Sequence, residues 1–437
     1  MSSEPGTTTR PFSELLTTAE TRDPERFAVD ERTPASVVRP ASVAELSELV
    51  RSAHADDLSM IPWGGGTQMG LGNLPDRFDA GIDMTELNEV LRYDPDDMTM
   101  SVQTGCRLQD LNQMLGENRQ VLPVDAVDPG QATIGGVTAT GTSGPRRLGY
   151  GPLRDLIIGM SVMATDGTVT KAGGQVVKNV TGFDMMRMHH GAMGSLGLII
   201  SINFKVIPKP QSERTVIATF DSLDQADTAA KEIVQSQLGV TAVVVLNAAA
   251  SAEISETDDG RWAISVRCEA PPSAVVRQAE RVVEYIGDQA QDVVIEDSTE
   301  RSEARWVAIC AAMDQRPTSP DIAIRLGQAA SKLGACAKSL SDALTSVENA
   351  RLTLDYGSGL CYLRIPRGAA ITGFDSGFLD SLSRHGDHCT VMTAPVEIKQ
   401  HVDVFGGARA GFSMIEALKA NFDPDRVLNP GRYIGRL

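Results

Sequence analysis

The sequence predicts an α+β protein with a two-lobed N-terminal domain and a separate cap in its C-terminal half. Up to about residue 210, short apolar strands alternate with amphipathic helices, and glycine-rich loops separate them. From residue 211 the strands and helices follow a repeating β-α-β-β-α-β order. We therefore expect a flexible tail at 1–29, an N-terminal domain at 30–210, a cap at 211–395 and a separate C-terminal segment at 396–437.

The first elements form a β-α-β unit. A strand at 35–38 ends at Pro40, and Ser42 with Glu45 makes a capping box before a helix with apolar residues at helical spacing. The next strand, 58–61, ends at Pro62. Further strands are expected at 81–84, 99–102, 120–124, 156–164 and 198–207, with a helix at 108–115.

The cap contains two copies of the same order of elements, which is the ferredoxin-like arrangement. Strands are expected at 215–220, 241–246, 262–268 and 292–296 in the first copy, and at 322–326, 352–355, 360–365 and 389–393 in the second. Helices are expected at 222–235 and 273–286, up to about 344, and at 378–382, and a helix at 299–313 joins the copies. The C-terminal segment carries an amphipathic helix at 412–420.

Two glycine-rich stretches are the candidate binding elements. Pro62 to Gln68 holds three consecutive glycines, whose N–H groups can form an anion nest, and Thr67 and Gln68 add side-chain donors. This pattern predicts a cradle for a pyrophosphate, and a flexible turn is the alternative. The second stretch, 128–144, ends in seven small uncharged residues between Val137 and Pro145. We interpret it as a close-approach surface for a flat or phosphorylated ligand rather than an irregular loop packed on the core.

Composition narrows the class of protein. A net charge of −17 argues against nucleic acid or an anionic membrane as partner. No apolar run approaches the roughly 20 residues of a transmembrane helix, and no secretory signal is visible. The six cysteines form no C-x-x-C pair, which argues against an iron–sulfur cluster or a structural zinc site and fits free thiols in a reducing cytosol.

As an ordered set, the motifs resemble the FAD-binding domain of the vanillyl-alcohol-oxidase/PCMH flavoproteins, which include D-lactate dehydrogenases and glycolate oxidase subunits. The set comprises the triple-glycine loop, A-T-I-G-G at 132–136, R-D at 154–155, K-N-x-T-G-F-D at 178–184 and G-x-x-G-S-L-G at 191–197. It covers about residues 30–210. The end of the chain, from Val391 to L-N-P-G-R at 428–432, resembles the E subunit of glycolate oxidase. The resemblance implies that the C-terminal segment at 396–437 returns to the N-terminal, FAD-binding domain.

The resemblance implies bound FAD and a set of contact residues. Non-covalent FAD is expected, because family members often attach flavin through a His or Cys in the first glycine loop and 64–72 contains neither. The implied cofactor-binding residues are Pro62, Trp63, Gly64, Gly65, Gly66, Thr67 and Gln68 at the pyrophosphate; Ala132, Thr133, Ile134, Gly135 and Gly136 along the diphosphate and ribityl chain; Thr142 and Ser143 nearby; Arg154 of the R-D motif; Gly194, Leu196 and Gly197 near the adenine half; and Asn429 near the isoalloxazine.

The function that the resemblance implies depends on a motif that is missing. Catalytic members carry H-x-G-D-G-N-x-H, and none of the six histidines here lies in such a motif. We therefore expect an FAD-binding, electron-transferring subunit of a glycolate-oxidase-like complex that oxidises a 2-hydroxy acid to a 2-oxo acid. Its partners would be a D-type flavoprotein subunit and an iron–sulfur subunit, and it would be cytoplasmic or held at the inner face of the membrane through them. Alone, it is not expected to turn over glycolate or D-lactate, and its catalytic residues stay unassigned.

Two other functions remain open. A self-sufficient FAD dehydrogenase or oxidase would need a cation for the substrate carboxylate, for which Arg364, Arg367 and Lys399 are candidates, and a base such as His388 or His401. A non-catalytic flavin-binding scaffold is the third hypothesis. The cluster R-H-G-D-H-C at 384–389 could ligate a metal through Asp387, His388 and Cys389, but a polar hairpin is favoured and no metal is predicted.

Overall fold

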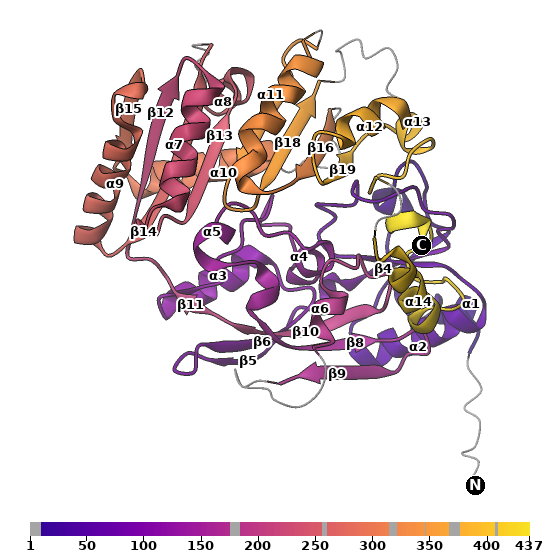
Figure 1. Ribbon diagram of the computed structural model, residues 1–437. Coiled ribbons are helices and arrows are strands. Elements are labelled where there is room, and N and C mark those ends of the chain that lie inside the picture. Colours follow the sequence, from indigo (N-terminus) through magenta and orange to yellow (C-terminus); the bar gives the residue numbers. More distant parts are fainter. Residues whose placement is uncertain are drawn as a thin grey trace.

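A cap stands over an N-terminal domain in this protein (Figure 1). The computed structural model describes residues 10–174, 184–255, 260–313, 321–345, 347–366, 376–406 and 410–437. Most of the K-N-x-T-G-F-D motif at 178–184 lies outside the described residues. Mixed sheets and helices form both parts, so the predicted α+β class is confirmed.

The first lobe of the N-terminal domain is built on a four-stranded sheet in the order β1-β2-β4-β3. β4 pairs in parallel with β2 and β3, and α2 packs its apolar stripe on this sheet after Ser42 Oγ accepts the Glu45 N–H at 3.1 Å. The glycine loop therefore leaves the sheet at the carboxyl end of β3. The elements are α1 Phe12–Leu15, β1 Glu20–Thr21, β2 Ser36–Arg39, α2 Val43–Ala55, β3 Met60–Trp63 and β4 Ala80–Asp83.

The second lobe is a five-stranded antiparallel sheet in the order β5-β6-β10-β8-β9. Its elements are β5 Val90–Asp94, β6 Thr99–Gln103, α3 Leu108–Glu117, β8 Ile157–Met163, β9 Val169–Gly173, α6 Met186–His189 and β10 Leu198–Lys205. The expected strand at 120–124 is shorter, because Pro123 has no N–H for a ladder: only β7, Gln120–Val121, pairs with β11, Ile207–Pro208. The expected strand at 198–207 is divided between β10 and β11 at Val206.

A helix replaces part of the expected ligand loop. Residues Ile134–Thr140 form α4, and α5 follows at Arg147–Tyr150. Thr133 caps α4 by accepting the Gly136 N–H at 3.3 Å, and Gly141 ends it in the left-handed conformation, with φ 71°. The small residues of this stretch thus serve as a closely packed helix rather than as an irregular surface.

The cap is one eight-stranded antiparallel sheet made of two ferredoxin-like halves. The order is β15-β12-β14-β13-β17-β18-β16-β19, and the halves join where β13 pairs antiparallel with β17. Both halves have the predicted strand order, so the duplicated architecture is confirmed. The strands are β12 Ser212–Phe220, β13 Ala242–Leu246, β14 Trp262–Ala270, β15 Asp292–Glu296, β16 Ile322–Gly327, β17 Arg351–Asp355, β18 Leu360–Ile365 and β19 His388–Thr393.

Different helices cover the two faces of the cap sheet. Apolar residues of α7, α9 and α11 form a core with one face, which Figure 1 shows toward the viewer. On the other face, α8 and α10 bury Trp306, Ile309 and Met313 against β13, and the rest of that face looks toward the N-terminal domain. The helices are α7 Leu223–Gln235, α8 Ala248–Ser255, α9 Pro272–Ile286, α10 Thr299–Met313, α11 Leu333–Ala343 and α12 Ser376–Ser383; α8 was not expected.

The C-terminal segment adds a short ladder to the first lobe. After α13 Val396–Lys399 and α14 Phe412–Phe422, the chain runs beside β3. The Met60 N–H donates to Val427 O at 2.6 Å, and the Asn429 N–H donates to Met60 O at 2.8 Å. Asn429 is therefore fixed beside the start of the glycine loop.

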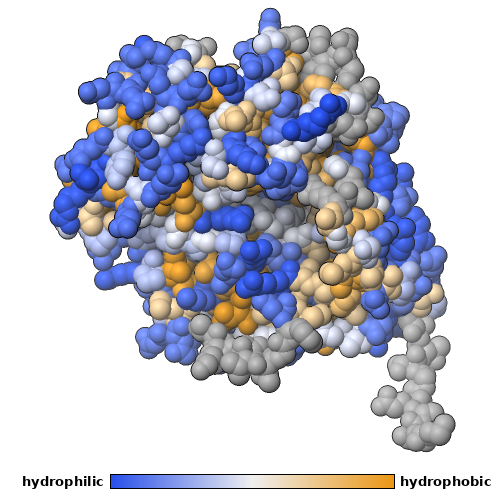
Figure 2. Space-filling model, viewed as in Figure 1, coloured by the Kyte–Doolittle hydropathy of each residue, from blue (hydrophilic) through white to orange (hydrophobic). Residues whose placement is uncertain are grey.

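The outer surface of the cap is mainly hydrophilic. Hydrophilic residues cover most of the cap on the face seen in Figure 2. Among the described residues, no helix has the length and apolarity needed to cross a membrane.

Candidate functional site

The two glycine-rich stretches meet and form one cleft, which we call the glycine cleft. A Cβ on Gly64 would overlap Thr133 Oγ1, and a Cβ on Gly65 would overlap the Gln131 carbonyl oxygen. Only Gly66 of the three takes a positive φ, 72°. The glycines therefore serve mainly to let the two chain segments approach closely, and one of them makes the turn.

The glycine cleft collects most of the predicted cofactor-binding residues. Its lining includes Pro62, Trp63, Gly64, Gly65, Gly66, Thr67, Gln68, Ala132, Thr133, Gly135, Gly136, Gly194 and Asn429. It also includes Ala139 and Thr140 of the second glycine-rich stretch, and Met69, Thr104, Val127, Met193, Leu198 and Arg432, which sequence reasoning did not single out. The latter six come from separate segments of the chain, and only the fold brings them together.

The remaining predicted residues lie outside the glycine cleft. Ile134 is fully buried in the core of the second lobe, and Leu196 and Gly197 belong to a buried turn behind the cleft. Arg154 is half exposed and pairs with Asp155 at 3.5 Å. Thr142 and Ser143 line a neighbouring cavity. Because none of these six residues lines the glycine cleft, the geometry does not favour their direct contact with a ligand bound there.

The C-terminal segment supplies two polar side chains to the end of the cleft nearest the cap. Asn429 Nδ2 donates to Met193 O, and its Oδ1 is buried without a partner among the described residues. Arg432 is 2% exposed and donates to the carbonyl oxygens of Met69 and Leu71, while its Nε is likewise unpaired. Burial lowers the pKa of Arg432 to about 10. A buried unpaired acceptor and donor at one place indicate a polar ligand edge there.

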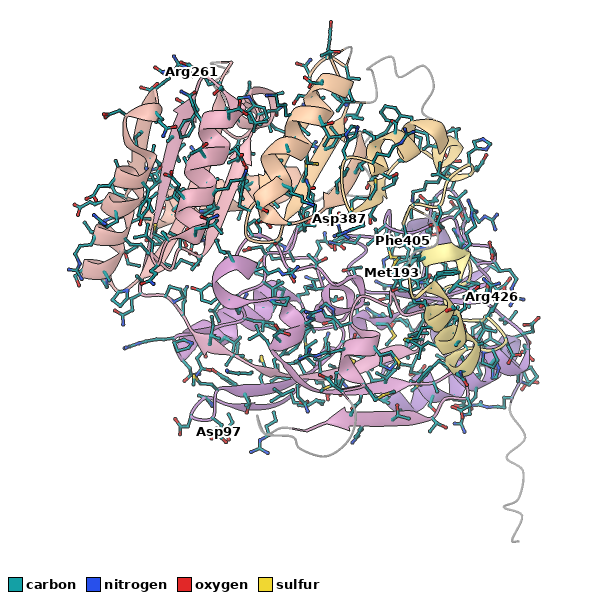
Figure 3. The ribbon with its side chains drawn as sticks, viewed as in Figure 1. Asp97, Met193, Arg261, Asp387, Phe405 and Arg426 are labelled. Carbon is teal, nitrogen blue, oxygen red and sulfur yellow. The ribbon has the colours of Figure 1, made fainter. Side chains whose placement is uncertain are left out.

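A second cavity of about 220 Å³ lies under the cap sheet, and we call it the cap cavity. It borders the glycine cleft, because Gln68, Val127 and Thr140 line both. Figure 3 shows Asp387, Phe405 and Met193 at this junction of cap and N-terminal domain. The polar groups that line the cap cavity are Asp125, Thr142, Ser143, Arg147, Cys310, Arg325, Ser358, Tyr362 and His388.

The cap sheet places three of these side chains on one face. Arg325 of β16 lies opposite Tyr362 of β18, and two residues further along β16 Gly327 lies opposite His388 of β19. A Cβ on Gly327 would overlap the His388 imidazole, so only glycine leaves room for the ring. Arg325 Nε is buried without a hydrogen-bond partner in the described part of the chain. A cation and a proton acceptor thus share one wall of the cap cavity.

The cations expected to hold a substrate carboxylate lie elsewhere. Arg364 points away and pairs with Glu253 at 2.9 Å and with Asp321 at 3.1 Å. Lys399 is fully buried and donates to the Asp30 carboxylate at 2.8 Å and to Gly70 O at 2.6 Å. Neither Arg364 nor Lys399 lines the glycine cleft or the cap cavity, and each is held in an ion pair with a carboxylate. Arg367 lies outside the described residues.

Arg325 and His388 line the cap cavity instead. The sequence names His388 as a candidate base, but it does not single out Arg325. The signal for Arg325 was present: it is the one charged residue in the apolar strand I-A-I-R-L-G. A charge inside such a strand points toward a polar partner or a ligand.

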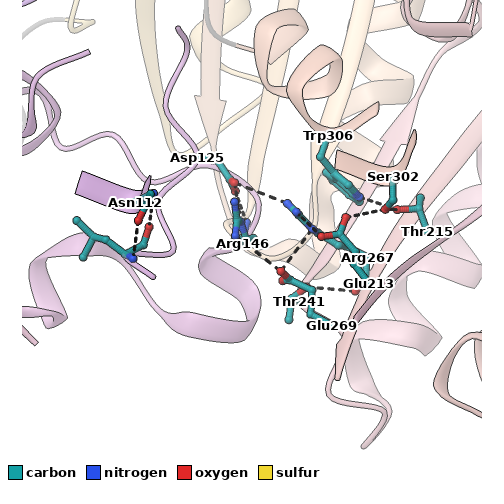
Figure 4. Close-up of polar contacts among 11 residues, drawn as sticks. Asn112, Asp125, Arg146, Glu213, Thr215, Thr241, Arg267, Glu269, Ser302 and Trp306 are labelled. Atoms are coloured by element: carbon teal, nitrogen blue, oxygen red, sulfur yellow. Dashed lines mark hydrogen bonds and ion pairs between the residues drawn. The ribbon is translucent and has the colours of Figure 1, made fainter. Parts of the chain in front are cut away.

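A buried ionic network joins the cap to the N-terminal domain beside these cavities (Figure 4). Arg267 of β14 donates to Glu213 at 2.6 Å and lies 3.7 Å from Glu269 and 3.8 Å from Asp125. Arg146 donates to Asp125 at 2.8 Å from the N-terminal domain. Burial raises the pKa of Glu213, and the positive charge of Arg267 opposes that shift. The network also borders a third cavity of about 670 Å³ between the domains.

The described residues contain no group of three or more His, Cys, Asp or Glu side chains positioned to hold a metal ion. His385 of the R-H-G-D-H-C cluster instead bonds Ser339 Oγ at 2.7 Å through Nδ1.

Two family models match the chain. Residues 34–173 match the FAD binding domain, and residues 209–328 match the C-terminal domain of the FAD linked oxidases. The glycolate oxidase subunit GlcD of Bacillus subtilis (strain 168) is 24% identical over 425 residues, which cover 92% of this chain and 89% of that protein. The mitochondrial D-2-hydroxyglutarate dehydrogenase of Bos taurus is 34% identical over 177 residues, or 40% of this chain and 32% of that protein.

Solved structures share the fold. The crystal structure of p-cresol methylhydroxylase with substrate bound gives a TM-score of 0.72 at 16% identity, covering 96% of this chain and 92% of that chain. Alkyldihydroxyacetonephosphate synthase gives 0.64 at 19% identity, covering 91% and 76%. None of the relatives named above is an E subunit of glycolate oxidase, so the resemblance to that subunit stays a prediction.

Proposed function

Because this chain belongs to the FAD-linked oxidases and is an FAD-dependent oxidoreductase, we propose that it oxidises a 2-hydroxy acid to the 2-oxo acid at the junction of the glycine cleft and the cap cavity. The observation that carries the proposal is that Arg325 and His388 lie on the same wall of the cavity next to the cleft. The named activities of GlcD and of the D-2-hydroxyglutarate dehydrogenase support the substrate class.

The residues of the glycine cleft fit FAD. The backbone of 64–66 and the side chains of Thr67 and Gln68 would hold the pyrophosphate, since N–H and side-chain donors converge there. Asn429 Oδ1 and Arg432 Nε, both buried and unpaired, would meet a polar edge of the flavin ring. When bound, FAD supplies the acceptor for the two electrons that the alcohol carbon loses.

The cap cavity supplies what the substrate needs. The Arg325 guanidinium would bind the carboxylate through two parallel hydrogen bonds and so fix the hydroxyl-bearing carbon. The His388 imidazole would accept the hydroxyl proton as that carbon is oxidised. The cap sheet forms one wall of this cavity and would limit the access of bulk water to the reacting carbon.

The test uses the full chain loaded with FAD under anaerobic conditions. Rapid mixing with a panel of 2-hydroxy acids should bleach the flavin absorbance, and dithionite reduction shows that the flavin is competent. His388→Asn should slow bleaching about 10²–10⁴-fold, the usual contribution of a general base. Arg325→Met should weaken substrate binding about 10–150-fold, which corresponds to a charged hydrogen bond of roughly 1.5–3 kcal/mol.

A matched control is His385→Asn. This histidine lies three residues from His388, but it bonds Ser339 and lines neither cavity. Its variant should bleach at the rate of the unmodified chain. Bleaching that is equally fast in His388→Asn would contradict the assigned base.

We propose, as the second candidate, that the chain transfers electrons in a glycolate-oxidase-like complex with a D-type flavoprotein subunit and an iron–sulfur subunit. The absence of H-x-G-D-G-N-x-H from the sequence supports it. Affinity purification from the native host separates the two candidates. If the isolated, FAD-loaded chain is inert toward every hydroxy acid but becomes active when a co-purifying flavoprotein is added, the electron-transfer function is the correct one.

A further inference from the structure

The cap cavity contains a second cation for which the proposed reaction has no use. Arg147, the first residue of α5, lines the cavity from the N-terminal domain, whereas Arg325 lines it from the cap. Among the described residues, the side chains of both arginines lack an ion-pair or hydrogen-bond partner. Neither arginine is a fully exposed surface charge, because both side chains are half-buried and Arg325 Nε is buried.

No carboxylate in the cavity neutralises these two arginines. Asp125 is the one acidic residue in the described lining, and Arg146 already binds it at 2.8 Å, with Arg267 a further 3.8 Å away. The guanidinium group of arginine is a cation in proteins. The cap cavity is therefore a local positive site within an acidic protein, and it attracts anions.

A ligand with one carboxylate leaves one of the arginines unsatisfied. When a small acid such as glycolate fills the site next to Arg325, Arg147 on the other wall is desolvated without gaining a partner, which costs free energy. A longer acid with a carboxylate at each end satisfies both guanidinium groups. The cavity, at about 220 Å³, has room for such a chain, since a water molecule takes only about 30 Å³.

We propose that the substrate is a 2-hydroxy dicarboxylate, whose carboxylate beside the hydroxyl binds Arg325 and whose distal carboxylate binds Arg147. This inference rests on the proposed function for the oxidation itself, but the binding of two carboxylates can be measured without it. Arg147 then determines specificity and takes no part in the proton transfer.

The experiment measures binding and turnover separately. Binding of glutarate and of butyrate to the FAD-loaded chain is followed by titration of the flavin difference spectrum; these acids carry no hydroxyl and cannot be oxidised. Turnover is measured with 2-hydroxyglutarate, malate, D-lactate and glycolate and a dye acceptor. Glutarate should bind about 10–150-fold more tightly than butyrate, the range for one added charged hydrogen bond. The hydroxy dicarboxylates should exceed the monocarboxylates in kcat/KM by a similar factor.

Three variants assign the preference to a residue. Arg147→Met should remove most of the preference for glutarate over butyrate, and Arg147→Lys should restore part of it, because lysine keeps the charge but not the planar fork. Arg277→Met, an exposed arginine on α9 far from the cavity, should leave the preference unchanged.

Each outcome decides between the two ideas. If glutarate shows the Arg147-dependent preference but no hydroxy acid is oxidised, the dicarboxylate site stands and the proposed function fails. If lactate or glycolate is oxidised as well as the dicarboxylates and glutarate binds no better than butyrate, the proposed function stands and this inference is overturned. An unchanged preference in a folded Arg147→Met chain also overturns it.

Discussion

The substitution Arg267→Met would remove the central cation from the ionic network that joins the cap to the N-terminal domain. Arg267 is 3% exposed and faces Glu213 at 2.6 Å, Glu269 at 3.7 Å and Asp125 at 3.8 Å. A charge pair at about 4 Å is worth roughly 4 kcal/mol at an effective dielectric of 20, before desolvation offsets most of it. Removing one partner leaves the carboxylates buried and uncompensated, which costs about 3–5 kcal/mol.

For a domain the size of the cap, each kcal/mol lowers Tm by about 2–4 °C, so the loss should be about 6–20 °C. The loss should also depend on pH. The folded-state pKa of Glu213 is already raised by burial, and without Arg267 it rises further. A carboxyl whose folded pKa lies above its unfolded value destabilises the protein fully above the folded pKa and is relieved as the pH falls below it. The deficit should therefore be larger at pH 8 than at pH 5.

The assay is thermal unfolding of the full chain followed by circular dichroism at pH 8 and pH 5. Arg281→Met on α9 is the control. Its side chain is 58% exposed and pairs with Glu284, which is also exposed, so Tm should change little. The double variant Arg267→Met with Glu213→Gln should recover part of the loss, because one uncompensated charge is gone. A Tm within about 2 °C of the unmodified chain at pH 8 would refute the reasoning and show that water reaches the network.

Three further outcomes concern the bound flavin, the first glycine loop and the buried ion pair at the end of α14. Acid precipitation should release yellow FAD into the supernatant, and flavin retained in the pellet would reveal a covalent link. Gly65→Val should lower FAD content severalfold, because its side chain meets the Gln131 carbonyl, whereas Gly116→Val, with open space around it, should not; equal flavin content in both would remove the loop from the site. Lys419→Met should lower Tm by several degrees relative to the exposed Lys338→Met, since it leaves the Asp423 carboxylate buried without its 2.6 Å partner, and this is measured in the same unfolding assay.

Local patterns were sufficient for most of the fold. These patterns involve residues only a few positions apart, so they can be recognised in the sequence. They include the capping box at Ser42, the apolar spacing of the cap helices and the turn residues between those helices. The exception at Ile134–Thr140 has a local reason as well. Thr133 is a good N-cap and Gly141 a good C-cap. The glycines between them have low helix propensity, and for that reason the sequence did not predict a helix there.

The site could be predicted only in part, because it has two kinds of component. The glycine loops could be identified from the sequence, because their runs of glycine and other small residues are local features. The cavity under the cap depends on which strands become neighbours. Arg325 and His388 reach the same wall because β19 pairs with β16, and no short segment encodes that pairing. The ionic network is harder still, since Asp125, Glu213 and Arg267 lie far apart in the chain and are brought together only when the cap docks.

The two halves of the cap sheet have the same architecture, but the first carries the ionic network and the second lines the cap cavity. In the first half, the face toward the N-terminal domain carries Arg267 and Glu213 on β14 and β12, which anchor the cap. In the second half, the matching strands β18 and β16 carry Tyr362 and Arg325, which line a hollow. An internal duplication of this kind lets one copy hold the assembly fixed while the other diverges. Changes of substrate, in evolution or by engineering, can therefore be concentrated at Arg325, Tyr362 and His388, while the ionic network of the first half and the packing of Ala323 and Met392 on Leu71 and Met193 stay in place.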